Sequence, residues 1–248
     1  IIIGGVALIY VANIMPFRVN MLMFQGLGAL ESQKDAIAWF DIEKKAIDLG
    51  GPHVDHVREE MARTLLRIRV PEAQRSAAVD LFKYTITQLE EARRRHPLDP
   101  VYHMLLGELW YGAYLIVPND FPRGIELGDQ AFASAIKVSP ERQQLYLLWA
   151  DHMGQAGLVA KGLDQLKKAR SFAPHSAFML KLYADYLENA GINAPERAYL
   201  RWLMMRLSPS LFGAEVDERI SFDLIKWVSA QAGVDRLQAL LTCAGHDT

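Results

Sequence analysis

Two segments decide the fold: GDQAFASAIKVSP (residues 128–140) and GLDQLKKARSFAP (residues 162–174). The second begins 34 residues after the first. Both place a small residue, a large apolar residue, an alanine and a proline at the same spacing: Gly128, Phe132, Ala135 and Pro140, then Gly162, Leu166, Ala169 and Pro174. Small residues let two helices approach closely, and larger ones fill the remaining space. This period predicts stacked helix pairs.

Prolines extend the pattern along the chain, because a proline shortly after a helix stops it from continuing. Pro97, Pro140, Pro174 and Pro209 each follow a similar helix. The interval from Pro97 to Pro140 exceeds a 34-residue period by about nine residues. We assign the surplus to residues 116–122, IVPNDFP, which are rich in helix breakers.

The first helix of each expected pair carries a pattern of its own, a large residue followed by a small one with a further conspicuous residue downstream. It comprises Leu106-Gly107 with Trp110, Trp149-Ala150 with Gly157, and Tyr183-Ala184 with Gly191. The whole pattern resembles the tetratricopeptide repeat (TPR) family over roughly residues 74 to 210. The resemblance implies an all-α, TPR-like α-solenoid of antiparallel helix pairs that binds proteins. No stretch alternates long enough to predict a strand.

The remaining chain gives three more parts. Residues 21–73 form a region of helical hairpins, in which residues 21–50 form one helix stopped by Gly50-Gly51-Pro52. Residues 55–70 and 72–96 predict two more helices, the latter with a break near Ser76. Residues 211–248 form a closing pair of helices, over 215–232 and 234–243.

The first part, residues 1–20, is predicted to be an apolar helix and has no charge before Arg18. Its first seventeen residues span about 25 Å as a helix, slightly less than a membrane core of ~30 Å. The chain lacks an initiating methionine and a basic signal-peptide start, so we expect a processed product or a piece of something longer. We expect a membrane, a groove of the chain itself or a neighbouring subunit to bury the anchor or assembly residues Ile1, Ile2, Ile3, Val6, Leu8, Ile9, Val11 and Phe17.

A second resemblance covers the whole chain. The apolar helix ends in NIMPFR (13–18), and VREEMA (57–62), HPLDP (96–100) and LLGE (105–108) follow in order. This order resembles the C-terminal part of bacterial O-antigen ligase-like membrane proteins, which end in a last transmembrane helix and a helical repeat domain. The resemblance implies a location outside the cytoplasm: periplasmic, at the cell surface or extracellular. That family's catalytic loops lie upstream of any residue present here.

Composition and motifs argue against several classes of protein. The net charge of −2 and the 51% hydrophobic content disfavour nucleic-acid binding and disorder. The basic run 93–96 lies at a predicted helix end, where cations complement the helix dipole. The single cysteine, Cys243, excludes an intrachain disulfide. We expect no enzyme, cofactor or metal, because no P-loop, dinucleotide or nucleophile-elbow motif is present.

The histidines do not change that expectation. His53 and His56 flank Asp55 without the zinc-site spacing, so Asp55 is predicted to cap a helix. His103 and His152 lie within predicted helices and are expected to be packed rather than catalytic.

The expected inner surface of the repeats carries an acidic ladder. Counting from the repeat starts, the ninth positions are Glu108, Asp151 and Asp185, with Tyr111 and Glu188 beside them. This predicts a groove for a partner that carries Lys or Arg between apolar residues. The alternative is that these carboxylates only keep an exposed face soluble.

We therefore expect a non-enzymatic scaffold that binds proteins or copies of itself, as a homo-oligomer and, through residues 1–17, as a fibre subunit. The alternative function is an accessory TPR domain of an O-antigen ligase- or polymerase-like membrane glycosyltransferase. The sequence does not identify the partner.

Overall fold

The computed structural model describes residues 10, 14–33, 35–68, 75–172 and 176–191, and within these ranges it contains helices and no strand. The chain divides into two compact units, Ile1–Leu145 and Tyr146–Thr248. The expected all-α class is confirmed for this part of the chain.

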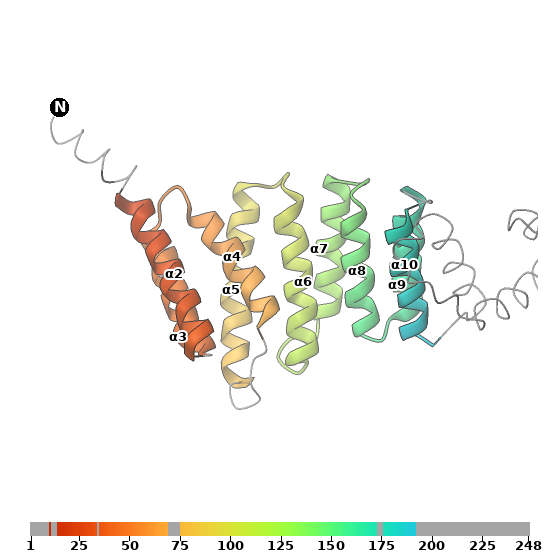
Figure 1. Cartoon of the computed structure of the whole chain (residues 1–248), viewed down its shortest axis with the longest axis horizontal. Coiled ribbons are helices and arrows are strands. Elements are labelled where there is room, and N and C mark those ends of the chain that lie inside the picture. Colours follow the sequence, from red (N-terminus) through yellow and green to blue (C-terminus); the bar gives the residue numbers. More distant parts are fainter. Residues whose placement is uncertain (1–9, 11–13, 34, 69–74, 173–175, 192–248) are drawn as a thin grey trace, which may run out of the picture. The chain divides into compact units, whose positions relative to one another are not determined.

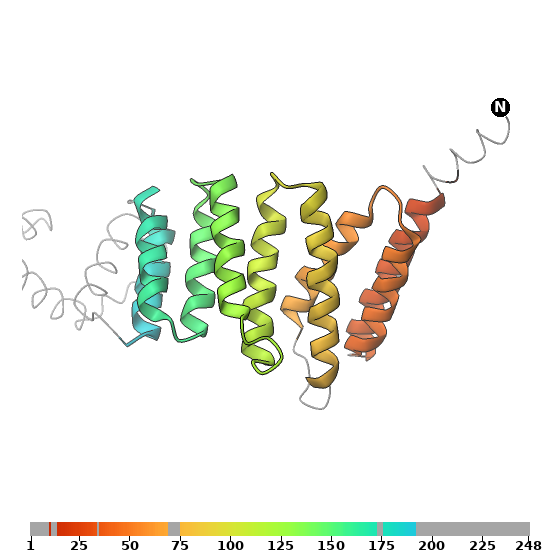
Figure 2. The same ribbon diagram turned by 180° about the vertical axis from the view of Figure 1, so that it is seen from behind.

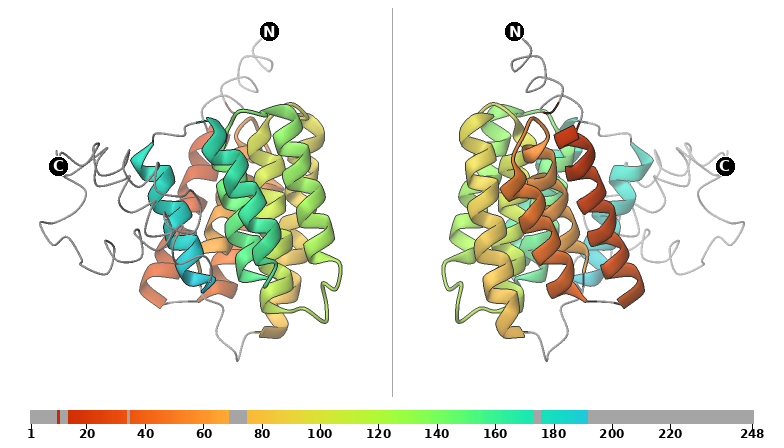
Figure 3. Two further views of the ribbon diagram at one scale, coloured as in Figure 1. Left: turned by 90° about the vertical axis from the view of Figure 1, so that its right-hand side faces the viewer. Right: turned by 90° about the vertical axis from the view of Figure 1, so that its left-hand side faces the viewer.

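The first unit is a series of antiparallel helices (Figures 1 and 2). It contains α2 (Met15–Gln33), α3 (Ala36–Leu49), α4 (Val54–Arg67), α5 (Arg75–Arg95), α6 (Pro100–Ile116) and α7 (Gly124–Val138). Helix α5 is continuous over its described range, so the expected break near Ser76 is absent there. Each helix packs on the next one along the chain (Figure 3).

The prediction of one helix over residues 21–50 was wrong. The chain turns back before α3, where Asp35 caps that helix: its Oδ1 accepts hydrogen bonds from the backbone N–H groups of Ile37 and Ala38, both at 3.0 Å. A side-chain cap of this kind satisfies N–H groups that have no partner within the helix, and so favours a helix start at this point. Helix α2 also runs across the predicted boundary at residue 20.

The expected cap at Asp55 was also wrong. Helix α4 begins at Val54, and Asp55 lies in its first turn. There its carboxylate forms an ion pair with Arg58 at 2.7 Å and accepts a hydrogen bond from His96 at 3.0 Å. Asp55 therefore joins α4 to the end of α5 instead of capping α4.

Helices α6 and α7 approach each other closely at two glycines. A Cβ atom added at Gly107 would come within 2.6 Å of the Phe132 ring, and one at Gly128 within 2.5 Å of the Tyr111 ring. Both rings are fully buried. The sequence prediction that small residues permit close packing here is confirmed.

The insertion between α6 and α7 lies where the sequence placed it. Helix α6 ends at Ile116, and the chain then forms turns until α7 begins. The ring of Phe121 is 5% exposed and contacts Phe82 and Trp110, with ring centroids 6.1 and 6.0 Å away. The insertion therefore contributes to the core instead of extending into solvent.

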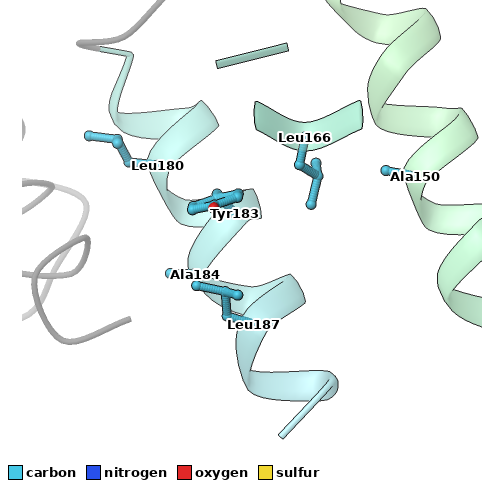
Figure 4. Packing of buried hydrophobic residues seen from close by; sticks show 6 residues of the cluster. All are labelled: Ala150, Leu166, Leu180, Tyr183, Ala184 and Leu187. Carbon is cyan, nitrogen blue, oxygen red and sulfur yellow. The ribbon is translucent and has the colours of Figure 1, made fainter. Parts of the chain in front are cut away.

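The second unit contains α8 (Gln143–Gln155, which begins at the end of the first unit), α9 (Val159–Phe172) and α10 (Ala177–Asn189). Figure 4 shows its buried cluster, in which α8 and α9 contribute one residue each and α10 the rest. The members are Ala150, Leu166, Leu180, Tyr183, Ala184 and Leu187. Ser176 caps α10 through a hydrogen bond from the Met179 N–H at 3.4 Å.

Within the described ranges, no helix has both the length and the apolar character needed to cross a membrane. Most of the predicted apolar segment, residues 1–9 and 11–13, lies outside those ranges. The part of the predicted repeat region beyond residue 191 and the predicted closing helices over 215–232 and 234–243 lie outside them as well.

Replacing Gly107 by valine is expected to lower the free energy of unfolding by about 1–3 kcal/mol, because the added side chain overlaps the buried Phe132 ring. Urea denaturation followed by circular dichroism measures the change. Gly112→Ala, on the same helix, is the matched control, since a Cβ there meets only side-chain atoms at 3.5 Å or more; it is expected to leave stability unchanged or raise it by up to about 1 kcal/mol. Equal effects of the two substitutions would contradict the packing described here.

Glu43 of α3 is 3% exposed, and its Oε2 has no hydrogen-bond partner among the described residues. Burial, with a smaller contribution from the charge of Glu60, raises the pKa of Glu43 from 4.5 to about 7. The native state therefore holds this proton more tightly than the unfolded chain does. The free energy of unfolding consequently falls as the pH rises from about 4.5 through 7.

Glu43→Gln is expected to remove this loss of stability, raising the free energy of unfolding by about 3 kcal/mol above pH 7 and changing it little near pH 4.5. Urea denaturation of both proteins across that pH range tests the prediction. The matched control is Glu141→Gln, since Glu141 is exposed. A difference between wild type and Glu43→Gln that does not vary with pH would contradict it.

Candidate protein-binding groove

A groove of about 320 Å³ lies between α8 and α10 of the second unit. Its apolar lining comes from both helices, with one leucine of α9 beneath them, and two carboxylates stand among these side chains. The lining residues are Leu147, Leu148, Asp151, Leu166, Leu182, Asp185, Tyr186 and Asn189. We call this the α8–α10 groove. Two of the three predicted ninth-position acids, Asp151 and Asp185, thus line the same depression.

Each of these acids has a partner on its own helix. Asp151 is exposed and accepts a hydrogen bond from Gln155 Nε2 at 2.8 Å. Asp185 forms an ion pair with Lys181 Nζ at 2.5 Å, and its side chain is 41% exposed. Exposed pairs of this kind contribute little to stability, so both carboxylates are able to exchange partners at small cost.

Tyr186 is a groove residue that the sequence analysis missed. Its ring lies against Gly154 and its hydroxyl against Gly162, and the hydroxyl donates a hydrogen bond to the Val159 carbonyl at 3.1 Å. Burial, assisted by the charge of Asp151, raises the pKa of Tyr186, so the hydroxyl keeps its proton. Gly154 and Gly162 were the sequence signal that could have predicted this position of Tyr186, because each lacks a side chain at a point where the tyrosine packs.

A second depression continues from the groove towards the start of α9. It shares Asp151, Tyr186 and Asn189 with the groove and adds Val159 and Gly154 to the lining. The two depressions therefore give a longer surface on which one extended or helical segment can lie.

The other predicted groove residues lie elsewhere. Glu108 is partly buried on α6, in the first unit. Tyr111 is fully buried against Gly128, and its hydroxyl donates a hydrogen bond to Asp129, so a partner cannot reach its ring. Glu188 is exposed on α10 but does not line the groove.

Of the predicted anchor residues, only Phe17 falls within the described ranges, and it is 69% exposed. Ile1, Ile2, Ile3, Val6, Leu8, Ile9 and Val11 lie outside them.

The basic run at the end of α5 is held by acids of the same chain. Arg93 pairs with Glu90, Arg94 with Glu91, and Arg95 with Glu91 and Asp55. Because these arginines are already paired with carboxylates, they offer less positive charge to a phosphate. This agrees with the interpretation of residues 93–96 as the basic end of a helix.

Asp55 is the centre of these contacts between α4 and α5. Partial burial raises its pKa, but hydrogen bonds from Arg58 and His96 and the charge of Arg95 outweigh it and hold the pKa below its usual value. The carboxylate therefore stays ionised and serves as a structural link.

The histidines of the helical repeats are packed, as predicted. His103 is 7% exposed and lies 3.0 Å from the Pro97 carbonyl through Nε2. Burial lowers the pKa of His152. Among the residues that the structure describes, no group of three or more His, Cys, Asp or Glu side chains is arranged to hold a metal ion.

No family model matches the chain, and no curated protein matches it. Among solved structures, the chain is similar to a thermophilic TPR protein from Thermus thermophilus, with a TM-score of 0.50 and 16% sequence identity. The match covers 86% of this chain and 98% of that protein. The fold is therefore TPR-like. The resemblance to O-antigen ligase-like proteins gains no support from these comparisons.

Tyr186→Phe is expected to lower the free energy of unfolding by about 1 kcal/mol, because it removes the hydrogen bond to Val159 and keeps the ring. Chemical denaturation measures the loss. If the denaturation midpoint of Tyr186→Phe equals that of the wild type, the hydrogen bond from Tyr186 to Val159 does not stabilise this part of the groove.

Proposed function

We propose that the protein is a protein-interaction scaffold whose α8–α10 groove binds a segment that carries Lys or Arg between apolar residues. A TPR-like fold is typical of protein-binding scaffolds, and such a fold alone does not specify the partner. The observation that carries the proposal is the placement of Asp151 and Asp185 in one leucine-lined groove.

The apolar part of the groove supplies the driving force. Leucines 147, 148 and 182 line it together with the ring of Tyr186. Burial of apolar side chains against them contributes about 25 cal/mol per Å². An extended or helical segment presents such side chains at regular intervals, as helix-in-groove recognition requires.

The carboxylates supply the selectivity. A basic residue of the partner takes the place of Lys181 at Asp185 and of Gln155 at Asp151, so no buried charge is left without a counterion. An acidic segment, or a free C-terminal carboxylate, meets like charge at both positions and is repelled.

The other parts of the expected function stay predictions. They are burial of residues 1–17 in membrane or in a neighbouring subunit, a location outside the cytoplasm, and fibre formation. The role of an accessory domain in a membrane glycosyltransferase likewise rests on the sequence resemblance alone.

The test uses a fluorescein-labelled peptide of leucines and lysines at helical spacing, with fluorescence anisotropy as the readout. The double substitution Asp151→Lys with Asp185→Lys is expected to weaken binding at least about tenfold, since it replaces two carboxylates by ammonium groups that repel the lysines of the peptide. Circular dichroism checks that the helices survive.

The matched control is Asp164→Lys, which reverses an acid on α9 that is 68% exposed and does not line the groove. It is expected to bind the peptide like the parent protein. Equal affinity for a peptide with glutamate in place of lysine, or unchanged affinity of the double variant, would overturn the proposal and leave the carboxylates as a solvated face.

A further inference from the structure

Helix α2 carries apolar side chains on two opposite faces. One face packs on α3: Val19 is 1% exposed, and Gly26 lies against Trp39 and Glu43. The outer side of the helix leaves Phe17 (69%), Met21 (51%) and Phe24 (75%) exposed, with Leu27 (40%) at its edge, and Tyr10 (39%) and Ile14 (45%) are exposed before the helix begins. A helix that is apolar on both faces is normally covered on both.

The spacing of the exposed side chains is regular. From Tyr10 to Phe24 the steps are four, three, four and three residues, and a further step of four leads to Gly28. This alternation is the heptad pattern of a coiled-coil seam. Exposed polar side chains border the seam at Arg18, Asn20 and Gln25.

We propose that this stripe (Tyr10 and Ile14 before α2, and Phe17, Met21, Phe24 and Gly28 on it) binds the same stripe of a second copy of the chain as an antiparallel two-helix coiled coil. The interaction goes beyond the groove function, because it lies in the first unit and uses no residue of the α8–α10 groove.

The antiparallel direction follows from side-chain size. In that direction Phe17 lies opposite Met21 of the second copy, Ile14 opposite Phe24, and Tyr10 opposite Gly28. A Cβ added at Gly28 meets nothing within 4 Å, which leaves room for a tyrosine ring. A parallel pair sets glycine against glycine and tyrosine against tyrosine, which leaves a gap at one end and crowding at the other.

The area and the borders of the stripe fit a second copy better than a lipid surface. The exposed area of the five large side chains of the stripe in two copies is on the order of 1,000 Å², about the least that a specific interface buries. A lipid surface favours a broad apolar face and requires no heptad spacing. Arg18 and Gln25 border the stripe on one side, and Asn20 and the exposed Leu27 border it on the other.

The first experiment is sedimentation velocity on the full chain over a range of concentrations. Wild type is expected to form a reversible dimer, and Phe17→Glu with Phe24→Glu is expected to weaken it about a hundredfold or more. The control, Leu98→Glu with Phe172→Glu, adds the same charges at exposed apolar residues outside the stripe and is expected to dimerise like wild type. A dimer that survives the stripe substitutions overturns the proposal.

The second experiment tests the direction by disulfide cross-linking in a Cys243→Ser background. Chains carrying Ile14→Cys and chains carrying Phe24→Cys are expected to cross-link when mixed, and neither is expected to cross-link alone. Cross-linking of either variant with itself indicates parallel pairing and overturns the antiparallel arrangement.

Flotation with vesicles of phosphatidylcholine and phosphatidylglycerol tests the lipid alternative. A wild-type chain that is monomeric in sedimentation and floats with vesicles, and a stripe variant that does not float, would show a membrane face instead. Because the peptide-binding assay uses other residues, failure of this proposal leaves the groove function untouched, and the reverse also holds.

Discussion

The close approach of paired helices at residues without a side chain supports the rest of this structure. Between α6 and α7, glycines 107 and 128 each admit an aromatic ring of the opposite helix. In the second unit, Gly162 lies against the Ala150 carbonyl and the Tyr186 hydroxyl. Protein interiors are close-packed, so a methyl group at such a position has to displace a ring or a backbone segment. The helix spacing is therefore fixed at these few points.

The α8–α10 groove follows from that spacing. Tyr186 reaches back to α9 because Gly154 and Gly162 leave space for it, and its ring then forms part of the groove lining. The carboxylates of Asp151 and Asp185 line the groove beside it. The residues that set the distance between helices thus also shape the surface that we propose for binding, and a partner meets a largely preformed site.

The two ends of a helical array differ from its middle, because a terminal helix has a neighbour on one side only. Helix α2 is the first long described helix of the first unit and packs on α3 through one face. Its outer face keeps large apolar side chains where an inner helix would bury them. The buried Glu43 lies beneath the same helix, so we expect the attachment of α2 to α3 to weaken as the pH rises through the pKa of Glu43.

The sequence by itself determined the repeat period, the helical class and the place of the insertion, because glycine, alanine and proline act locally on helix approach and helix ends. It also identified Asp151 and Asp185, since their positions follow from the period. It did not determine the turn before Asp35, the role of Asp55, the burial of Tyr111 or the part of Tyr186 in the groove. Tertiary contacts decided these: a carboxylate caps a helix or pairs with an arginine according to which neighbours reach it, and a tyrosine lines a surface or fills a core according to the glycine opposite.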